Sequence, residues 1–262
     1  MPSGTEAAST GRVLSASKVA VSPVEPFASL QWPSDIVERA AKQALAASTA
    51  ALVRAALAAS PSPTPRMGLG SGSTAFLTLL ALADTRTQLP AGLAVVATSY
   101  EMEWYAMAAG FAVVALDTDG VEVAFDGADQ VDRHGAMVKG RGGAMHRERA
   151  VLAAARSELI VADATKRVAT LGGRPLPLDL DPSSIFDTVS DIERVADAAV
   201  RVRTSTGKDG PLLSESGGVL ADLEVPDGRT ISAELDGLLR AVDGVRDTGY
   251  FPPSPKRQFV DG

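Results

Sequence analysis

The chain of 262 residues contains no cysteine, and this absence removes several kinds of chemistry at once. A disulfide framework, a thiolate zinc site, an iron–sulfur cluster and a cysteine nucleophile are all excluded. Histidine is nearly as scarce, because His134 and His146 are the only two, and they lack the spacing of a metal site. Any chemistry must therefore come from other oxygen and nitrogen groups, and we expect neither a metal nor a cofactor.

The chain also lacks an excess of positive charge and a long apolar run. Its 25 Lys and Arg residues against 32 Asp and Glu give a formal net charge of −7, which works against binding a phosphate backbone. The densest apolar stretch, 41–59, is interrupted by Lys42 and Arg54 and falls short of the roughly eighteen residues of a membrane span. We therefore expect a soluble chain with no nucleic-acid or membrane partner.

Residues 1–33 are rich in Ser, Ala, Val and Pro and poor in acidic residues. This composition is compatible with an organellar transit peptide, and also with a plain disordered extension, which we favour. The expected location is accordingly the cytoplasm, with the plastid stroma as the alternative.

The pattern of apolar runs from residue 34 to 174 predicts an α/β fold. A helix is expected from Ile36 to about Ala59, and a strand, a glycine-rich loop and a helix follow over 67–82. Further buried strands and helices then alternate; the predicted strands are 93–97, 112–116, 121–125 and 159–162, and the predicted helices are 101–109 and 144–155. Alternating units with strands apolar on both faces favour an open, mostly parallel sheet with helices on both faces.

The character of the chain changes after residue 174. Short strand-like pieces at 199–203 and 219–225, a Gly/Asp-rich turn at 206–211 and one helix at about 232–241 predict a small α+β domain. We expect this domain to span 175–242. The α/β catalytic domain is expected to comprise 34–174 and 243–262, ending in a tail.

A glycine-rich loop joins the first predicted strand to its helix. Glycines allow backbone N–H groups to point inward at a helix start, so Ser71, Gly72, Ser73 and Thr74 form a candidate phosphate cradle. No Gly-Lys-Ser/Thr follows, and Ser73 replaces the third glycine of the dinucleotide pattern, so neither of those nucleotide motifs is present. A tight turn without a ligand is the alternative.

Acidic residues follow the predicted strand 121–125. Asp126 and Asp129, with Gly127 and Ala128 between them, stand where ligands bind in an open α/β sheet. Two carboxylates facing one crevice can take part in proton transfer. The alternative is an Asp-rich turn that caps its own backbone.

A cation and a carboxylate flank the next helix start. Lys139 precedes Gly140, Arg141 and Gly142, and Glu148 lies about one turn inside the helix. Lysine can stabilise a developing oxyanion, and a carboxylate can act as a base beside it; the alternative is a solvated lysine with an Arg147/Glu148 surface pair. Lys166 follows a further strand and is a candidate phosphate contact. Together these motifs predict a pocket for a small anionic, polyhydroxylated substrate and proton transfer next to a carbonyl.

Four ordered motifs resemble the ribose-5-phosphate isomerase type A family, and the Lys-Gly-Arg-Gly-Gly form is similar to the plant members. They are Gly70-Ser71-Gly72-Ser73-Thr74, Asp126-Gly127-Ala128-Asp129, Lys139-Gly140-Arg141-Gly142-Gly143 with Arg147-Glu148, and Ala162-Asp163-Ala164-Thr165-Lys166. The resemblance implies metal-independent interconversion of D-ribose 5-phosphate and D-ribulose 5-phosphate through an enediolate, in the non-oxidative pentose phosphate pathway. It also implies a homodimer or homotetramer, with the small domain in the oligomer contacts.

The resemblance implies a role for each motif. Residues 71–74 would bind the phosphate end of the substrate, and Asp126 and Asp129 would hold hydroxyls and help open the ring. Lys139 would stabilise the enediolate oxygen beside the glycines of 140–143, Glu148 would move the proton between C1 and C2, and Lys166 would add a substrate contact.

The chain departs from the family pattern in four places. Gln130 replaces a usual Glu, and 213–218 replaces a Thr-Asp-Asn-Gly-Asn segment. The N-terminal phosphate-binding lysine has two candidates, Lys42 and Arg39, and the terminal strand expected after Phe251 is missing from the pattern.

Three other functions stay open at this stage. A noncatalytic sugar-phosphate sensor on the same scaffold is the first, although the chain lacks a basic helix for DNA binding in 1–33. An isomerase of a different sugar phosphate is the second. An NAD-dependent oxidoreductase is disfavoured, because the third glycine and a suitable acidic residue are both absent.

Overall fold

The structure is a computed structural model that describes residues 29–261. The predicted N-terminal extension, 1–33, lies almost entirely outside the described residues. Within 29–261, none of the helices combines the length and the hydrophobicity that a bilayer crossing requires.

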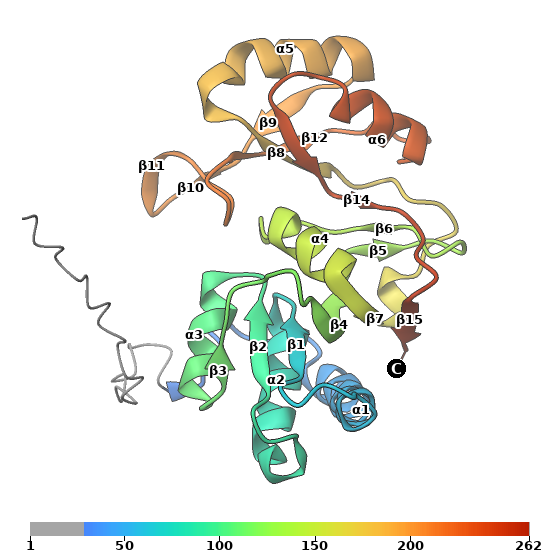
Figure 1. Cartoon of the computed structure of the whole chain (residues 1–262). Coiled ribbons are helices and arrows are strands. Elements are labelled where there is room, and N and C mark those ends of the chain that lie inside the picture. Colours follow the sequence, from blue (N-terminus) through green and yellow to red (C-terminus); the bar gives the residue numbers. More distant parts are fainter. Residues whose placement is uncertain (1–28, 262) are drawn as a thin grey trace, which may run out of the picture.

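A six-stranded, wholly parallel sheet forms the larger part of the molecule (Figure 1). Its strands lie in the order β15-β7-β4-β1-β2-β3. Their bounds are β1 (Arg66–Leu69), β2 (Ala94–Ala97), β3 (Ala112–Val113), β4 (Val121–Gly127), β7 (Ala155–Val161) and β15 (Arg257–Val260). The predicted mostly parallel sheet is confirmed.

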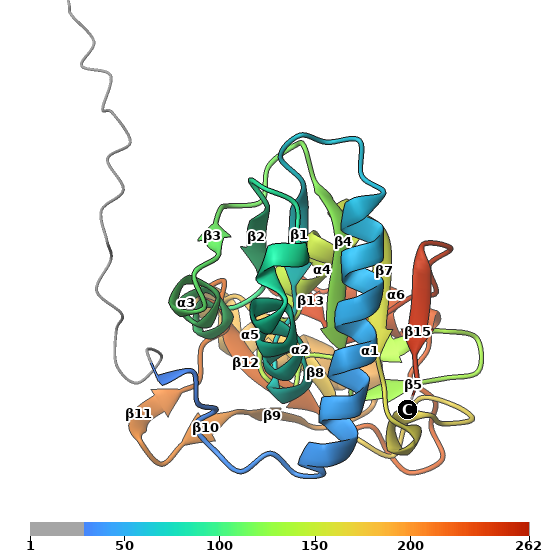
Figure 2. The same cartoon turned by 90° about the horizontal axis from the view of Figure 1, so that it is seen from below.

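Helices cover both faces of this sheet, because its strands carry apolar side chains on both faces. On one face Met67, Val95 and Phe125 pack in a core with α1 (Arg39–Ala58), α2 (Ser73–Asp84) and α3 (Tyr100–Ala108). On the other face Val96 and Ala124 pack against α4 (Met145–Ala154). Figure 2 shows α1 and α2 in front of the strands from below, and Figure 1 shows α4 between the sheet and the rest of the chain.

A smaller α+β unit sits beyond α4. Its antiparallel sheet has the order β13-β8-β12-β9, and Figure 1 shows two helices on the far side of it. The bounds are β8 (Leu176–Leu180), β9 (Val200–Val202), β12 (Val219–Leu223), β13 (Val245–Thr248), α5 (Ile185–Ala196) and α6 (Ala233–Arg240). The predicted fold class, an α/β sheet with a smaller α+β part, is confirmed.

A three-stranded sheet of short strands joins the two parts. β14 (Tyr250–Phe251) pairs with β6 (Met137–Val138), which pairs with β5 (Gln130–Val131). β14 comes directly after β13, so one stretch of chain leaves the small sheet and enters this one. The predicted turn at 206–211 is instead the end of a hairpin of β10 (Thr204–Ser205) and β11 (Lys208–Pro211).

The predicted tail after Phe251 is wrong. Residues 257–260 form β15, which pairs in parallel with β7 at the edge of the large sheet. β7 lies about a hundred positions earlier in the chain, as Arg257 opposite Glu158 illustrates, and such a distant partner leaves no local pattern. The segment 243–248 also differs, because β13 pairs with β8 of the small sheet. The division of the chain into two domains otherwise remains a prediction.

Two helices differ from expectation. α1 begins at Arg39 rather than Ile36, because Glu38 adopts a left-handed conformation with φ 55° that interrupts the helical backbone. α5 was not predicted at all, although its buried face repeats at helical spacing through Thr188, Ile192 and Ala196. Ile185, Val189, Ile192 and Ala196 also repeat at this spacing, so the sequence does carry a local signal for this helix.

Gly68 of β1 lies where the large sheet packs closely against α4. A Cβ at this position would lie 2.6 Å from both the Ala124 Cβ and the Val151 Cγ1. We predict that Gly68→Ala lowers the free energy of unfolding by about 1–3 kcal/mol, the usual cost of overpacking. Urea denaturation would measure it, with Gly237→Ala at an exposed position of α6 as the matched control, since no atom outside the backbone of that helix lies within 4 Å of its added methyl group. That control should be neutral or stabilising, and an equal loss in both variants would contradict the prediction.

Candidate active site

A cavity of about 630 Å³ opens at the carboxyl ends of β1, β4 and β7. Every residue predicted for the site lines it: Ser71, Gly72, Ser73, Thr74, Asp126, Gly127, Ala128, Asp129, Lys139, Gly140, Arg141, Gly142, Glu148 and Lys166. The parallel order of the strands explains this convergence, since successive crossover loops emerge at one edge. The roles of these residues remain predictions.

A buried lysine lies between two buried carboxylates at the centre of the cavity. The Lys139 Nζ atom is 3.0 Å from Asp126 Oδ2 and 3.2 Å from Glu148 Oε2. It also donates a hydrogen bond to the Gly127 carbonyl oxygen at 2.5 Å. The three side chains are at most 7% exposed, so bulk water screens these interactions little. The alternative of a solvated Lys139 and an Arg147/Glu148 surface pair is wrong.

The backbone of the glycine-rich loop fixes Asp126. Its Oδ1 atom accepts hydrogen bonds from the N–H groups of Ser71, at 3.2 Å, and of Gly127, at 2.8 Å. A Cβ at Gly70 would lie 2.3 Å from the same oxygen. Only glycine at position 70 therefore allows the loop to approach the carboxylate this closely.

Burial and mutual charge shift the pKa values of this triad. Burial, reinforced by the charge of Asp126 and opposed by Lys139, raises the pKa of Glu148 to about 8. Burial likewise raises the pKa of Asp126 against the opposing effect of Lys139. Burial acts to lower the pKa of Lys139, but the two carboxylates outweigh it and raise that pKa above its ordinary value. The lysine thus stays cationic, while Glu148 can exchange a proton near neutral pH.

Asp129 lies nearer the surface than the triad and faces the second glycine-rich segment. Its Oδ2 atom accepts a hydrogen bond from the Arg141 N–H at 3.2 Å, and its side chain is 26% exposed. The Arg141 side chain itself is 88% exposed. Arg141 therefore contributes to this part of the cavity mainly through its backbone.

The other part of the cavity is suited to an anion. α2 begins at Ser73 after Gly72, whose φ of 93° turns the loop into the helix start. The Ser71 hydroxyl shares a 2.8 Å hydrogen bond with Thr98, and Lys42 Nζ is 3.5 Å from Ser73 Oγ. Lys42 and Lys166 both line the cavity, which selects Lys42 over Arg39 as the candidate N-terminal cation. A helix N-terminus with two nearby lysines favours a phosphate.

The structure adds residues that sequence reasoning missed. Glu101 and Glu215 also line the cavity. Glu215, from the divergent segment 213–218, accepts a hydrogen bond from the Tyr100 N–H at 3.0 Å and lies 3.6 Å from Arg147. No local pattern marked it, because its contacts depend on the small domain reaching the large one. Burial and the charge of Glu215 raise the pKa of Glu101.

The other divergent position, Gln130, faces away from this chemistry. Its amide donates to the Gly172 carbonyl at 2.8 Å and accepts from the Gly172 N–H at 3.2 Å. The two histidines also take no part: His134 is exposed, and His146 lies 3.7 Å from Asp247. Among residues 29–261, no group of three or more acidic or histidine side chains is arranged to hold a metal ion.

Residues 94–261 match the family model described as ribose 5-phosphate isomerase A (phosphoriboisomerase A). The chain belongs to this family. The chain is 33% identical over 159 residues to the ribose-5-phosphate isomerase A of Methanothermobacter thermautotrophicus. The aligned region covers 60% of this chain and 68% of that relative. It is 34% identical over 173 residues to the Deinococcus radiodurans protein of the same name, and the aligned region covers 64% of this chain and 74% of that protein.

Solved structures of the family share the fold. The ribose 5-phosphate isomerase A of Methanocaldococcus jannaschii superposes with a TM-score of 0.74 at 25% identity, over 85% of this chain and 95% of that one. A D-ribose-5-phosphate isomerase in complex with phospho-erythronic acid gives a TM-score of 0.72 at 25% identity, over 87% and 96%. The family resemblance noted in the sequence is confirmed.

The pKa of Glu148 predicts a pH dependence of stability. A carboxyl whose pKa is raised from 4.5 to about 8 binds more protons in the folded state, so its contribution to stability falls as pH rises between those values. Glu148→Gln resembles the protonated form at every pH. We predict that the difference in free energy of unfolding, Glu148→Gln minus the unsubstituted chain, increases from pH 5 to pH 8. Urea denaturation across this range checks it, and a difference that does not vary with pH would contradict it.

Proposed function

We propose that this chain interconverts D-ribose 5-phosphate and D-ribulose 5-phosphate by proton transfer through an enediolate. The observation that carries the proposal is the buried Asp126–Lys139–Glu148 triad in the same cavity as a phosphate-binding helix start. A base beside a fixed cation is what proton abstraction next to a carbonyl requires.

The family relatives support this choice of substrate. Both relatives compared above carry the name ribose-5-phosphate isomerase A. A similar isomerase of known structure was determined in complex with phospho-erythronic acid, which carries both a phosphate and a carboxylate. This distribution of charge matches a cavity with a phosphate cradle and a cation beside a base.

The substrate phosphate binds at residues 71–74, with Lys42 and Lys166 close to it. Asp126 and Asp129 bind hydroxyl groups and assist ring opening. In the open-chain aldose, Glu148 removes the proton from C2, and the electron pair moves to the C1 oxygen. Lys139 stabilises the negative charge that forms there.

Glu148 then delivers the proton to C1, and the proton of the C2 hydroxyl passes to the C1 oxygen. The product is the ketose, with a carbonyl at C2 and a hydroxyl at C1, so no atom is gained or lost. Since the pKa of Glu148 is about 8, the same group can both take and return the proton near neutral pH.

Two further properties are proposed, the first of them on the family resemblance. They are assembly into a homodimer or homotetramer and a location in the cytoplasm.

Replacing the base tests the reaction directly. We predict that Glu148→Gln lowers kcat/KM for ribose 5-phosphate by about 10³-fold or more, within the range for a lost general base. For the unsubstituted chain, kcat/KM should rise with pH through an apparent pKa near 8. Purified protein would be assayed in EDTA, with Glu122→Gln as control because that residue pairs with Arg156 outside the cavity.

A folded unsubstituted chain that does not act on either pentose phosphate would overturn the proposal. A panel of other aldose and ketose phosphates would then distinguish an isomerase of another sugar from a sensor that only binds.

The phosphate cradle is tested through KM. We predict that Lys42→Ala and Lys166→Ala each raise KM about tenfold, the size expected for one charge-assisted hydrogen bond. Lys208→Ala is the control, since its Nζ donates to the Pro211 carbonyl in the β10–β11 hairpin. Unchanged KM values in both cradle variants would place the phosphate elsewhere.

A further inference from the structure

One short stretch of chain contacts both Lys139 and α4, the helix that carries Glu148. This stretch, residues 247–251, runs from the end of β13 through β14, and we call it the support segment. The Lys139 N–H donates to the Gly249 carbonyl at 2.9 Å, and β14 pairs with β6, the strand directly before Lys139. A Cβ at position 249 would lie 2.4 Å from the Lys139 carbonyl oxygen, so the two backbones are in close contact.

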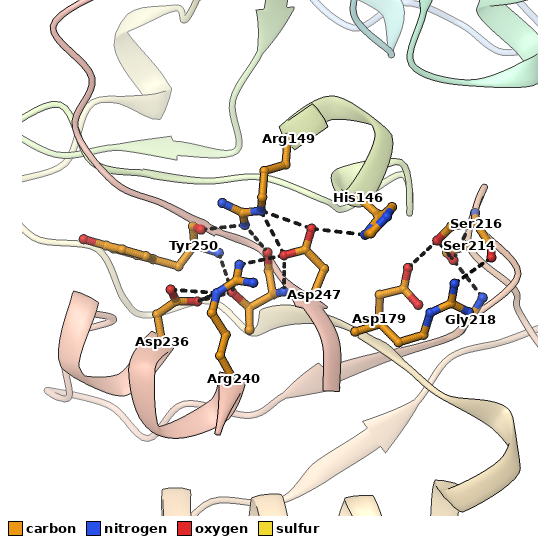
Figure 3. A network of polar contacts seen from close by, with 12 residues as sticks. His146, Arg149, Asp179, Ser214, Ser216, Gly218, Asp236, Arg240, Asp247 and Tyr250 are labelled. Atoms are coloured by element: carbon orange, nitrogen blue, oxygen red, sulfur yellow. Dashed lines mark hydrogen bonds and ion pairs between the residues drawn. The ribbon is translucent and has the colours of Figure 1, made fainter. Parts of the chain in front are cut away.

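Arg149, the residue after Glu148 on α4, binds that helix to the support segment through hydrogen bonds (Figure 3). Its Nε atom lies 2.9 and 3.1 Å from the two carboxylate oxygens of Asp247. Its Nη2 atom donates to the carbonyls of Thr248 and Tyr250, each at 2.8 Å. A guanidinium with this many fixed acceptors has little freedom to move.

The ring of Phe251 lies against both Lys139 and Arg149. The Arg149 Cζ atom lies 4.1 Å from the centroid of its ring, and the Lys139 Nζ atom lies 5.8 Å from the same centroid. Both cations are within the range of a cation–π interaction. The ring therefore packs against the catalytic lysine and against the anchor of α4.

Asp247 connects this arrangement to the small domain. Its side chain is buried, and Arg240 of α6 donates to it at 2.6 Å, next to the bond from Arg149. Asp236 in turn bonds to Arg240 and to the Thr248 hydroxyl (Figure 3). One buried carboxylate is thus shared by two arginines, one from the helix that carries Glu148 and one from the small domain.

We propose that Asp247 and Arg149 are positioning residues, which hold Glu148 and Lys139 at their reacting separation and make that separation depend on the small domain. The inference rests on the proposed function. Glu148 and Lys139 come from different elements, and their 3.2 Å separation needs a common support. The support segment is bonded to both elements. A shift of about 1 Å in such a pair can cost a hundredfold in rate.

The test uses the full chain with Asp247→Asn and Arg149→Lys. Neither side chain lines the cavity, so we expect kcat for ribose 5-phosphate to fall about 10- to 100-fold while KM changes less than about threefold. A loss confined to stability, or a rise in KM without a fall in kcat, would overturn the inference. Asp247→Asn can fail to fold, because it leaves two arginines uncompensated; Arg149→Lys, which keeps the charge, then decides alone.

Glu158→Gln is the matched control. Glu158 is buried like Asp247 and is bonded to an arginine at 2.8 Å, but its partners are Arg257 and Ser254 rather than a residue of α4. We expect it to lower stability and to leave kcat within about twofold. An equal fall in kcat for Glu158→Gln would show that the effect is general loosening, and would overturn the inference.

A second readout does not depend on turnover. NMR titration of the ¹³C-labelled Glu148 carboxyl should give a changed pKa in Arg149→Lys, where the formal charge is kept and only the geometry is altered. The charged and titratable groups facing Asp247 are Arg149 and His146 of α4, Arg240 and Asp236 of α6, and Asp179 opposite it on β8. An unchanged titration in Arg149→Lys would overturn the inference. An inactive unsubstituted chain with a changed titration would instead refute the proposed function.

Discussion

The burial of Lys139 between Asp126 and Glu148 is the interaction on which the rest of the site depends. Removing three ionisable side chains from water is unfavourable, and it is tolerated only where geometry and hydrogen bonds compensate it. The compensation comes from distant parts of the chain: the N–H of Ser71 on Asp126, the Gly127 carbonyl on Lys139, and the close approach that Gly70 allows. The fold therefore has to bring the first, fourth and seventh strands and α4 together before the site exists.

The burial of this triad has a chemical consequence. Burial, with the charge of Asp126 added, raises the pKa of Glu148 to about 8 although Lys139 opposes the rise, and Lys139 itself remains protonated. A base of this strength can abstract a proton and return it, as an enediolate mechanism requires. The same arrangement disfavours the folded state as Glu148 ionises, so reactivity and stability oppose each other at this residue.

Local patterns predicted the parallel sheet and the candidate residues. The fold brings every one of those residues to one cavity, since the carboxyl ends of parallel strands share one edge. The same patterns could not find β15, whose partner β7 is about a hundred residues away, or Glu215, which reaches the cavity from the small domain. Both of these features depend on contacts between segments distant in sequence. The predicted elements also omit α5, although its apolar residues repeat at helical spacing, and start α1 three residues early, because Glu38 is left-handed.

The amino-acid sequence by itself determined the kinds of groups in the site, the glycines that let the backbone approach them, and the order of strands and loops that collects them. Only the tertiary structure decided which groups are charged and held in place. Burial sets the pKa of Glu148, and the sharing of Asp247 between Arg149 and Arg240 ties the helix that carries Glu148 to the small domain. The physical reason is that burial and ion pairing are properties of neighbours in space, which the order of residues specifies only through the completed fold.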